Sequence, residues 1–360
     1  MNLRTLCFEL AVACALPAMA QQAGTNDNPS DECKQYLQTP LPTEAAQVAT
    51  PKQWPDCNSY KLYSGIGTKV DYAAARKCAW SERLAQQANL GPEYTTSSLF
   101  GGSAMLTVLY ANGEGVEQNK ALALRFGCES DLSNPGMQEI EKLPTQAHIV
   151  DKKEFRYCDG AMTTFEMNFC AAYDAEIAQQ KREDAFEIIM QQWPQKDRDA
   201  FKVLQSASEN YVQAHGAGEV YQGGTIRDIR TNGIEERQRD KFLAAVQLFE
   251  SGHLPKGTRL DFEKVDGDLN ATYKQALSLA GNQDFKSDYG LIHPEGIRDA
   301  ERAWLKYRDA WLAFAKLRYS TTDPNAWLTL LTRNRYWSLR LTMCDMGWKD
   351  AACKNVADDM

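Results

Sequence analysis

Large apolar side chains recur at helical spacing over two long stretches of this chain, and no other feature limits its possible folds as strongly. In the first stretch, Phe165, Phe169, Tyr173 and Ile177 follow one another every four residues, which places them on one face of a helix. The apolar residues of the second stretch are Ala300, Ala303, Trp304, Tyr307, Trp311 and Phe314. The chain is therefore predicted to be all-α, with both stripes in its core.

A shorter pattern occurs twice nearer the N-terminus. Leu62-Tyr63-Ser64-Gly65-Ile66-Gly67 precedes Asp71, and Leu109-Tyr110-Ala111-Asn112-Gly113-Glu114-Gly115 precedes Asn119. An alanine-rich segment follows each copy. This pattern indicates a helix-turn-helix repeat, which consists of a tyrosine near a helix end, a G-x-G turn, a polar cap and a second helix. Residues 55 to 130 thus resemble Sel1-like repeats, α-solenoid units that serve as protein-interaction scaffolds.

Two repeats are fewer than the roughly three units that such arrays usually need to bury a continuous core. Degenerate units at residues 30 to 55 or 132 to 150, or docking on the rest of the chain, are expected to complete it. A nucleotide-binding loop is the alternative interpretation of G-x-G. It is disfavoured because neither copy follows a strand pattern or extends to G-x-G-x-x-G.

The first 20 residues have the pattern of a secretory signal. Arg4 supplies a positive start, Leu10 to Leu16 is an apolar run, and Ala18-Met19-Ala20 is a cleavage pattern. Cleavage after Ala20 and a periplasmic mature chain are expected. Cys14 allows a lipoprotein as an alternative, although the residues before it are not a leucine-led lipobox. No later stretch approaches the roughly 20 apolar residues of a membrane span, so no membrane insertion is expected.

Eight cysteines follow the leader, and an even count in an exported chain indicates disulfides. Zinc is the alternative, but the sequence has no C-x-x-C and its four histidines lie singly. Local closure is favoured, although other pairings remain open. The favoured pairs are Cys57 with Cys78, Cys158 with Cys170, Cys344 with Cys353 and, by elimination, Cys33 with Cys128.

The formal net charge of -8 disfavours nucleic acid as a partner, because a polyanionic backbone requires a basic surface. An acidic excess suits a basic protein partner through long-range attraction, although solubility explains it equally well. No cofactor is expected.

Common catalytic motifs are missing from the sequence. It contains no G-x-S-x-G, no H-E-x-x-H and no Walker loop, and no serine is followed three residues later by lysine. Glu166 and Asp174 are eight residues apart on one helix face and could pair as general acid and base. A structural role for Glu166 at the start of the helix is favoured, so the protein is predicted not to be an enzyme.

Three motifs occur in order in the second half of the chain. Tyr157-Cys158 through Cys170 comes first, Leu269 to Tyr273 follows, and Ala300 to Ala310 completes the set. Together they resemble the lysozyme-inhibitor LprI-like family, a helical periplasmic module, over residues 151 to 353. The signature residues implied by this resemblance are Glu166, Asn168, Leu269, Asn270, Tyr273, Trp304 and Arg308. The resemblance implies a protein that binds and blocks another protein.

The chain departs from the family pattern in two places. Trp311-Leu312 stands where typical members carry a cysteine, and roughly a hundred residues separate Cys170 from Leu269. The segment Ala207 to Arg239 also parallels Ala300 to Arg335, which indicates an internal duplication with modules at about 151 to 252 and 253 to 353.

The predicted architecture is a signal peptide at residues 1 to 20, a short Sel1-like α-solenoid at 21 to 147, and an LprI-like helical-bundle domain at 148 to 360. The predicted function is periplasmic inhibition of an envelope-attacking enzyme, either a lysozyme-type muramidase or a secreted antibacterial effector such as a lipase or amidase. A periplasmic scaffold or regulator that uses the Sel1-like repeats is the alternative.

Residues 298 to 340 concentrate tryptophan, tyrosine and arginine, the residue types that dominate binding hot spots. Most of these aromatic side chains are expected in the core. The loop at residues 319 to 325, within this segment, is the predicted contact site, with glycine-rich residues 216 to 225 as its counterpart. Its proposed partner-binding residues are Arg318, Tyr319, Thr321, Thr322, Asp323 and Asn325.

Overall fold

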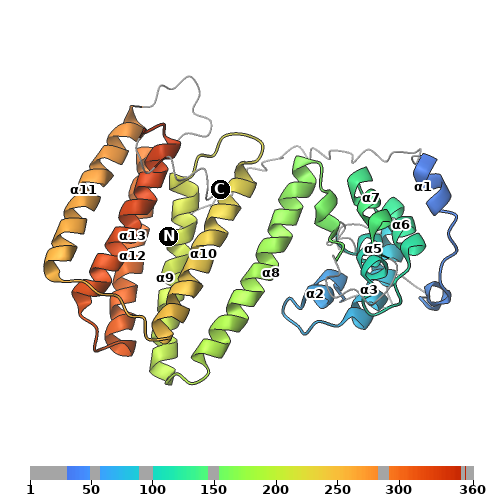
Figure 1. Ribbon diagram of the computed structural model, residues 1–360, viewed down its shortest axis with the longest axis horizontal. Helices are drawn as coiled ribbons and strands as arrows, with labels where there is room; N and C mark the ends of the chain where they lie inside the picture. The colour runs from blue at the N-terminus through green and yellow to red at the C-terminus, as the bar shows by residue number, and fades with distance from the viewer. Residues whose placement is uncertain are drawn as a thin grey trace, which may run out of the picture.

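The computed structural model describes residues 31–48, 57–88, 100–144, 154–282, 292–349 and 353. Every regular element within these ranges is a helix, which confirms the all-α prediction (Figure 1). Among the described helices, none combines the length and the apolar character of a membrane-spanning segment. The leader predicted for residues 1 to 20 lies outside the described residues.

Short helices build the N-terminal part of the molecule. They are α1 (Asp31–Tyr36), η1 (Thr43–Gln47), α2 (Ser59–Ser64), α3 (Tyr72–Gln87), α5 (Ser103–Asn112), α6 (Lys120–Glu129), α7 (Asn134–Lys142) and η2 (Tyr157–Gly160). Helix α5 is buried along its whole length, and Leu106 and Leu109 on it are fully inaccessible to solvent. The core of this part therefore forms around α5.

The two helix-turn-helix units have the same turn chemistry. The equivalent residues are Gly65 and Gly113, which end the first helices in the left-handed conformation, and Asp71 and Asn119, whose side chains cap the second helices. The cap amide donates to the carbonyl of Leu62 in one unit and of Tyr110 in the other, at 2.9 Å in both. This register pairs Leu62 with Tyr110. The expected equivalence of Tyr63 and Tyr110 is therefore wrong by one residue, because the turn hydrogen bonds determine which positions correspond.

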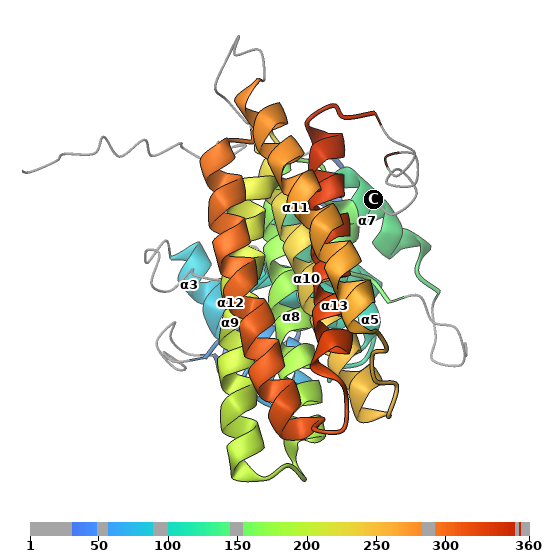
Figure 2. The ribbon, with the colours of Figure 1, turned by 90° about the vertical axis from the view of Figure 1, so that its left-hand side faces the viewer.

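Six long helices form a bundle in the C-terminal part. They are α8 (Thr164–Met190), α9 (Gln195–Glu219), α10 (Arg227–Glu250), α11 (Arg259–Gly281), α12 (Pro294–Arg318) and α13 (Pro324–Asp345). Across the bundle their packing order is α11, α13, α12, α9, α10 and α8 (Figure 1). Seen from the α11 side, the helices run alongside one another (Figure 2). The α8–α10 and α11–α13 sets meet through their middle helices, α9 and α12.

Helices α9 and α12 approach closely where Gly218, near the end of α9, faces Gly296, near the start of α12. A β-carbon at Gly218 would lie 2.4 Å from the Gly296 carbonyl oxygen, so a larger residue would push the helices apart. At the other end, the rings of Phe201 on α9 and Phe314 on α12 lie 5.3 Å apart. The two helices are therefore antiparallel.

The structure treats the two predicted apolar stripes differently. In the second stripe, Trp304, Trp311 and Phe314 are buried, as predicted. In the first stripe, Phe165 is 62% exposed and Phe169 is 43% exposed, so their assignment to the core is wrong. The physical reason is the length of α8, because only its C-terminal half contributes a buried aromatic side chain, Phe186, to the bundle core.

The N-terminal helices dock on the middle of α8. The Tyr60 hydroxyl donates to Glu176 at 2.7 Å, and the Ser64 and Tyr173 hydroxyls lie 2.6 Å apart. The Gly67 amide donates to the side-chain oxygen of Gln180 at 2.9 Å. Docking on the rest of the chain, one of the two ways expected to complete the short array of repeats, is thus present in the structure.

Candidate protein-binding surface

All four favoured disulfide pairs are present. They are Cys33–Cys128, Cys57–Cys78, Cys158–Cys170 and Cys344–Cys353. Such a set indicates an oxidising compartment outside the cytoplasm.

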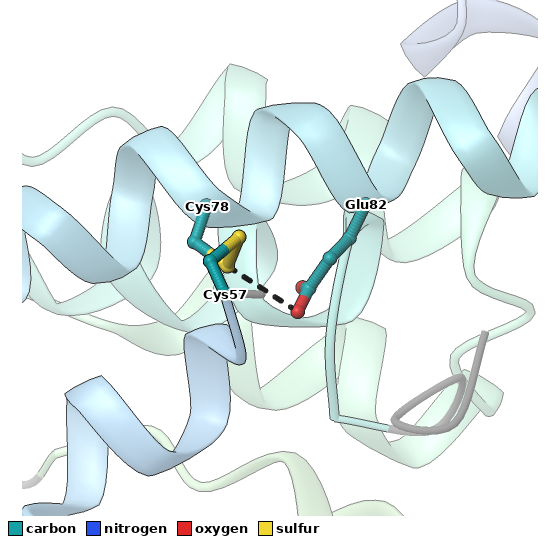
Figure 3. A group of neighbouring side chains, drawn as sticks. All are labelled: Cys57, Cys78 and Glu82. Carbon is teal, nitrogen blue, oxygen red and sulfur yellow. Dashed lines mark hydrogen bonds between the residues drawn. A yellow bond between two sulfur atoms is a disulfide. The ribbon is translucent and has the colours of Figure 1, made fainter. Parts of the chain in front are cut away.

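The group formed by Cys57, Cys78 and Glu82 has the composition of a metal site (Figure 3). The two sulfur atoms are bonded to each other, so neither is available as a thiolate ligand. The Glu82 carboxylate accepts hydrogen bonds from the Ser59 amide at 2.9 Å and from the Gly102 amide at 2.8 Å. The chemistry of this group is therefore that of a structural staple.

The loop predicted as the contact site begins with two residues that belong to the bundle. Tyr319 is only 8% exposed, its ring stacks on Trp327, and its hydroxyl donates to Glu250 at 2.7 Å. The Arg318 guanidinium pairs with the same carboxylate at 2.7 Å and lies over the Trp193 ring. The expectation that Tyr319 is an exposed loop residue is wrong, because Glu250 at the end of α10 draws both side chains onto the bundle.

The remaining residues of the loop cap α13 or form the turn that precedes it. Asp323 caps α13, and its carboxylate accepts from the Asn325 amide at 2.8 Å and from the Asn325 side chain at 2.9 Å. Thr321 and Thr322 lie in the turn between α12 and α13. The proposed counterpart is also partly wrong, since Gly216 is a buried residue of α9 rather than a loop residue.

Trp337 on α13 is the better candidate for a contact residue. Trp304, Trp311 and Trp327 are at most 2% exposed, whereas Trp337 is 46% exposed. Its register in the helix explains the difference, because Trp337 is out of phase with the buried positions Leu339 and Met343. This phase was a usable sequence signal that the prediction missed.

The side chains around Trp337 complete an aromatic and basic surface. The Arg340 guanidinium lies 5.2 Å from the centroid of the Trp337 ring and 5.4 Å from that of Tyr336. Leu341, one turn after Trp337 on α13, is 42% exposed. We call Arg333, Tyr336, Trp337, Arg340 and Leu341 the Trp337 surface. Its composition is that of an interface hot spot.

The signature residues of α11 and α12 mostly support the core. Leu269, Tyr273 and Trp304 pack in one apolar cluster. Arg308 lies over the Trp304 ring at 5.4 Å and pairs with Asp309 at 2.9 Å. Asn270 is exposed and donates to the Asp266 carbonyl one turn earlier, at 2.8 Å.

At the start of α8, Glu166 forms a capping box with Thr163 and accepts from its amide at 2.8 Å. Burial opposes the ionisation of Glu166, but the backbone hydrogen bonds outweigh it and lower the pKa of the carboxyl. Asp174 pairs with Arg156 at 2.6 Å. Both carboxylates therefore have structural partners, as expected for Glu166. The side-chain oxygen of Asn168 is buried and has no hydrogen-bond partner in the described structure.

A buried ionic network joins α9, α12 and α13, and the sequence prediction missed it. The Arg335 guanidinium and the Glu219 carboxylate are both fully inaccessible to solvent and form two hydrogen bonds, of 2.6 and 2.7 Å. Glu301 accepts a third bond from Arg335 at 2.9 Å. His215 lies 3.6 Å from Glu219, and burial lowers the pKa of its imidazole to about 4.

His215 also lies 3.1 Å from the Ser338 hydroxyl, a pairing that nucleophilic catalysis would need. The amide nitrogen of Gln238 donates to Nδ1 of His215 at 3.0 Å. The lowered pKa makes this buried imidazole a weak base, and its other neighbour is the Glu219 carboxylate, which Arg335 binds. We therefore assign His215 and Ser338 a structural role.

Comparison with known protein families gives a match in the C-terminal part of the chain. Residues 258–336 match the model of the family described as Lysozyme inhibitor LprI. No curated protein and no solved structure matches the chain. The matched segment begins at Thr258, the cap of α11, and ends at Tyr336 inside α13. Helices α11, α12 and the first half of α13 thus resemble a family that is described as a lysozyme inhibitor.

Proposed function

We propose that this protein is a stoichiometric inhibitor of a lysozyme-type muramidase, and that it acts in the periplasm after removal of residues 1 to 20. The match of residues 258–336 to the LprI family carries the proposal. The four disulfides are consistent with an exported protein. A secreted lipase or amidase is the alternative target.

We further propose that residues 148 to 360 are a duplicated LprI-like domain with modules at about 151 to 252 and 253 to 353. Helices α8 and α11, which would begin the two modules, both start with a capping box, at Thr163 and Thr258. In each set, an arginine of the third helix pairs with a glutamate of the second. These pairs are Arg239 with Glu209 and Arg335 with Glu301. Residues 21 to 147 would be the Sel1-like part, supported by the shared turn chemistry of its two units.

The Trp337 surface is the proposed inhibitory contact. A muramidase carries a pair of carboxylates in its substrate cleft, so an inhibitor benefits from positive charge beside an apolar anchor. On α13, the exposed Arg333 lies one turn before Trp337 and provides that charge. Tyr336, the last residue of the family match, is part of the same surface.

The proposal is tested by titrating the mature protein against purified c-type and g-type lysozymes. We expect activity to fall in proportion to the molar ratio and to reach its minimum at one inhibitor per enzyme. Trp337→Ala should weaken inhibition by at least about 2 kcal/mol. The control Leu248→Ala removes a side chain that is 49% exposed on α10 and should change nothing. Suppression that continues to deepen with time at substoichiometric amounts would contradict the proposal.

A scaffold that uses the N-terminal repeats is the second candidate, and the two helix-turn-helix units favour it. A fragment of residues 21 to 147 separates the two functions. If the α11–α13 helices carry inhibition, this fragment should bind muramidase weakly or not at all. Binding as tight as that of the whole chain would move recognition to the N-terminal helices.

A further inference from the structure

The start of α8 presents a second apolar surface, far from Trp337 in the packing order of the bundle. Phe165 is 62% exposed, Phe169 is 43% exposed, and their ring centroids lie 4.7 Å apart. Met162, just before the helix, is 63% exposed. Neighbouring exposed apolar side chains of this size are characteristic of interaction sites.

Covalent and polar bonds hold these rings in place. The Cys158–Cys170 disulfide closes the segment that leads into the helix, and Cys170 follows Phe169 directly. The capping box of Thr163 and Glu166 secures the first turn. The exposure of Phe165 and Phe169 therefore belongs to a fixed part of the fold and does not come from a frayed helix end.

A small pocket opens beside Phe169. It is lined by Phe100, Leu132, Ser133, Tyr157, Gly160, Ala161, Glu166, Phe169 and Cys170. Most of these side chains are apolar. The hydroxyl of Tyr157 already donates to the Ser130 carbonyl at 2.9 Å, which leaves the ring as the surface that it offers. Its volume of about 10 Å³ has room for roughly one water molecule, so an apolar side chain of a partner would pack across the mouth of the pocket and against Phe169.

The surroundings of the pocket are acidic. Burial raises the pKa of Tyr157 to about 12, and the negative charges of Glu166 and Asp131 add to this effect. Asp131 is exposed on the loop that leads to Leu132 and Ser133, and Asp159 is exposed next to Gly160. The nearby Arg156 is paired with Asp174 and does not neutralise this charge. A cation placed beside an apolar side chain that packs on this surface would meet favourable charge.

We propose that the α8 surface, formed by Met162, Phe165, Phe169 and the adjoining pocket, is a docking site for a protein segment that presents an apolar side chain flanked by lysine or arginine. The phenylalanines supply the contact area, the mouth of the pocket extends it, and Asp131, Asp159 and Glu166 attract the flanking cations. This site is separate from the Trp337 surface, because α9, α10 and α12 lie between α8 and α13 in the packing order. It does not depend on inhibition of a muramidase.

The test uses the whole mature protein and three labelled peptides, without any muramidase. The first peptide has a central leucine with two lysines on each side. The second replaces the lysines with glutamates, and the third replaces the leucine with serine. We expect the first peptide to bind at least about 10-fold more tightly than either of the others, as measured by fluorescence anisotropy.

Variants then connect that binding to the site. Phe165→Ala/Phe169→Ala should weaken binding of the lysine peptide about 10-fold or more, with unchanged circular dichroism. Asp131 has a φ of 54°, a conformation that asparagine tolerates, so Asp131→Asn removes only the charge. It should weaken binding about 2-fold to 5-fold and reduce its dependence on salt. Leu248→Ala and Trp337→Ala are the controls and should have no effect.

Equal affinity for the lysine and glutamate peptides, or no binding of either, would overturn the proposal. Unchanged binding by the double phenylalanine variant would do the same. Muramidase inhibition is measured separately on the same variants, so the two proposals can fail independently.

Discussion

Helices α8 and α11 occupy the two outer edges of the bundle, but their surroundings differ (Figure 1). Tyr173, Glu176 and Gln180 on α8 bind the N-terminal helices through hydrogen bonds. On the exposed side of α11, Gly267 has open space where a side chain would begin. Both helices thus share a place at an edge of the bundle, but the hydrogen bonds to the N-terminal helices come from side chains that α8 presents.

The third helices of the two sets differ in a similar way. Arg239 on α10 pairs with Glu209, Glu235 and Glu236, but its side chain keeps 18% exposure. Arg335 on α13 is fully inaccessible to solvent. The same kind of ion pair should therefore contribute differently to stability, since water can replace a lost partner more easily at the partly exposed Arg239 than at the buried Arg335.

The largest expected effect comes from removing these arginines. Arg335→Ala should reduce the free energy of unfolding by about 3 to 5 kcal/mol, because it leaves the buried carboxylate of Glu219 without its partner. Arg239→Ala, the matched control, should cost about 1 kcal/mol or less. Urea denaturation of both variants measures the difference. Equal losses would mean that burial does not distinguish the two networks.

The second prediction concerns the starts of α8 and α11, since only α8 has a disulfide at its start among the described residues. Cys158→Ser/Cys170→Ser should lower the free energy of unfolding by about 2 to 3 kcal/mol, because the crosslink restricts the unfolded chain. Thermal and urea denaturation provide the measurement. Thiol titration of the denatured, non-reduced wild-type protein should find no free cysteine in the mature chain. Several reactive thiols there would contradict the disulfide assignment.

The third prediction uses His215, which lies where the two sets of helices meet. Burial lowers its pKa from 6.5 to about 4. Between these pH values, His215 therefore binds a proton in the unfolded chain but not in the folded protein. Stability should fall by about 2 kcal/mol as the pH drops from 6.5 to 4. His215→Gln should flatten this slope in urea denaturation measured across that range. An unchanged slope in the variant would assign the effect to other groups.

The smallest predicted effect compares the two capping boxes. Thr258→Ala at the start of α11 should cost about 1 kcal/mol, the usual loss for an N-cap residue. Thr163→Ala should cost roughly half of that, because the Cys158–Cys170 disulfide also holds the start of α8. The free energies of unfolding in urea give both values. A larger decrease in the free energy of unfolding for Thr163→Ala than for Thr258→Ala would show that the disulfide does not help to hold the start of α8.

Local patterns in the sequence were sufficient for much of the structure. Asp71 and Asn119 cap the helices that follow the two G-x-G turns, as their spacing predicts. Glu166 supports the start of its helix, and the short-range disulfides form as expected. These features depend on residues close together in the chain, so their geometry follows from helix periodicity and turn chemistry.

Exposure was decided by the tertiary structure. Phe165 and Trp304 both lie on apolar helical stripes, but only Trp304 faces another helix and is buried. Tyr319 follows a helix end where a loop residue is expected, but Glu250, 69 residues earlier, binds its hydroxyl. The sequence by itself determined the helices, their caps and the residue types available for binding. Only the packing of distant helices determined which of those residues reach the surface, because burial depends on the partner helix and not on the local pattern.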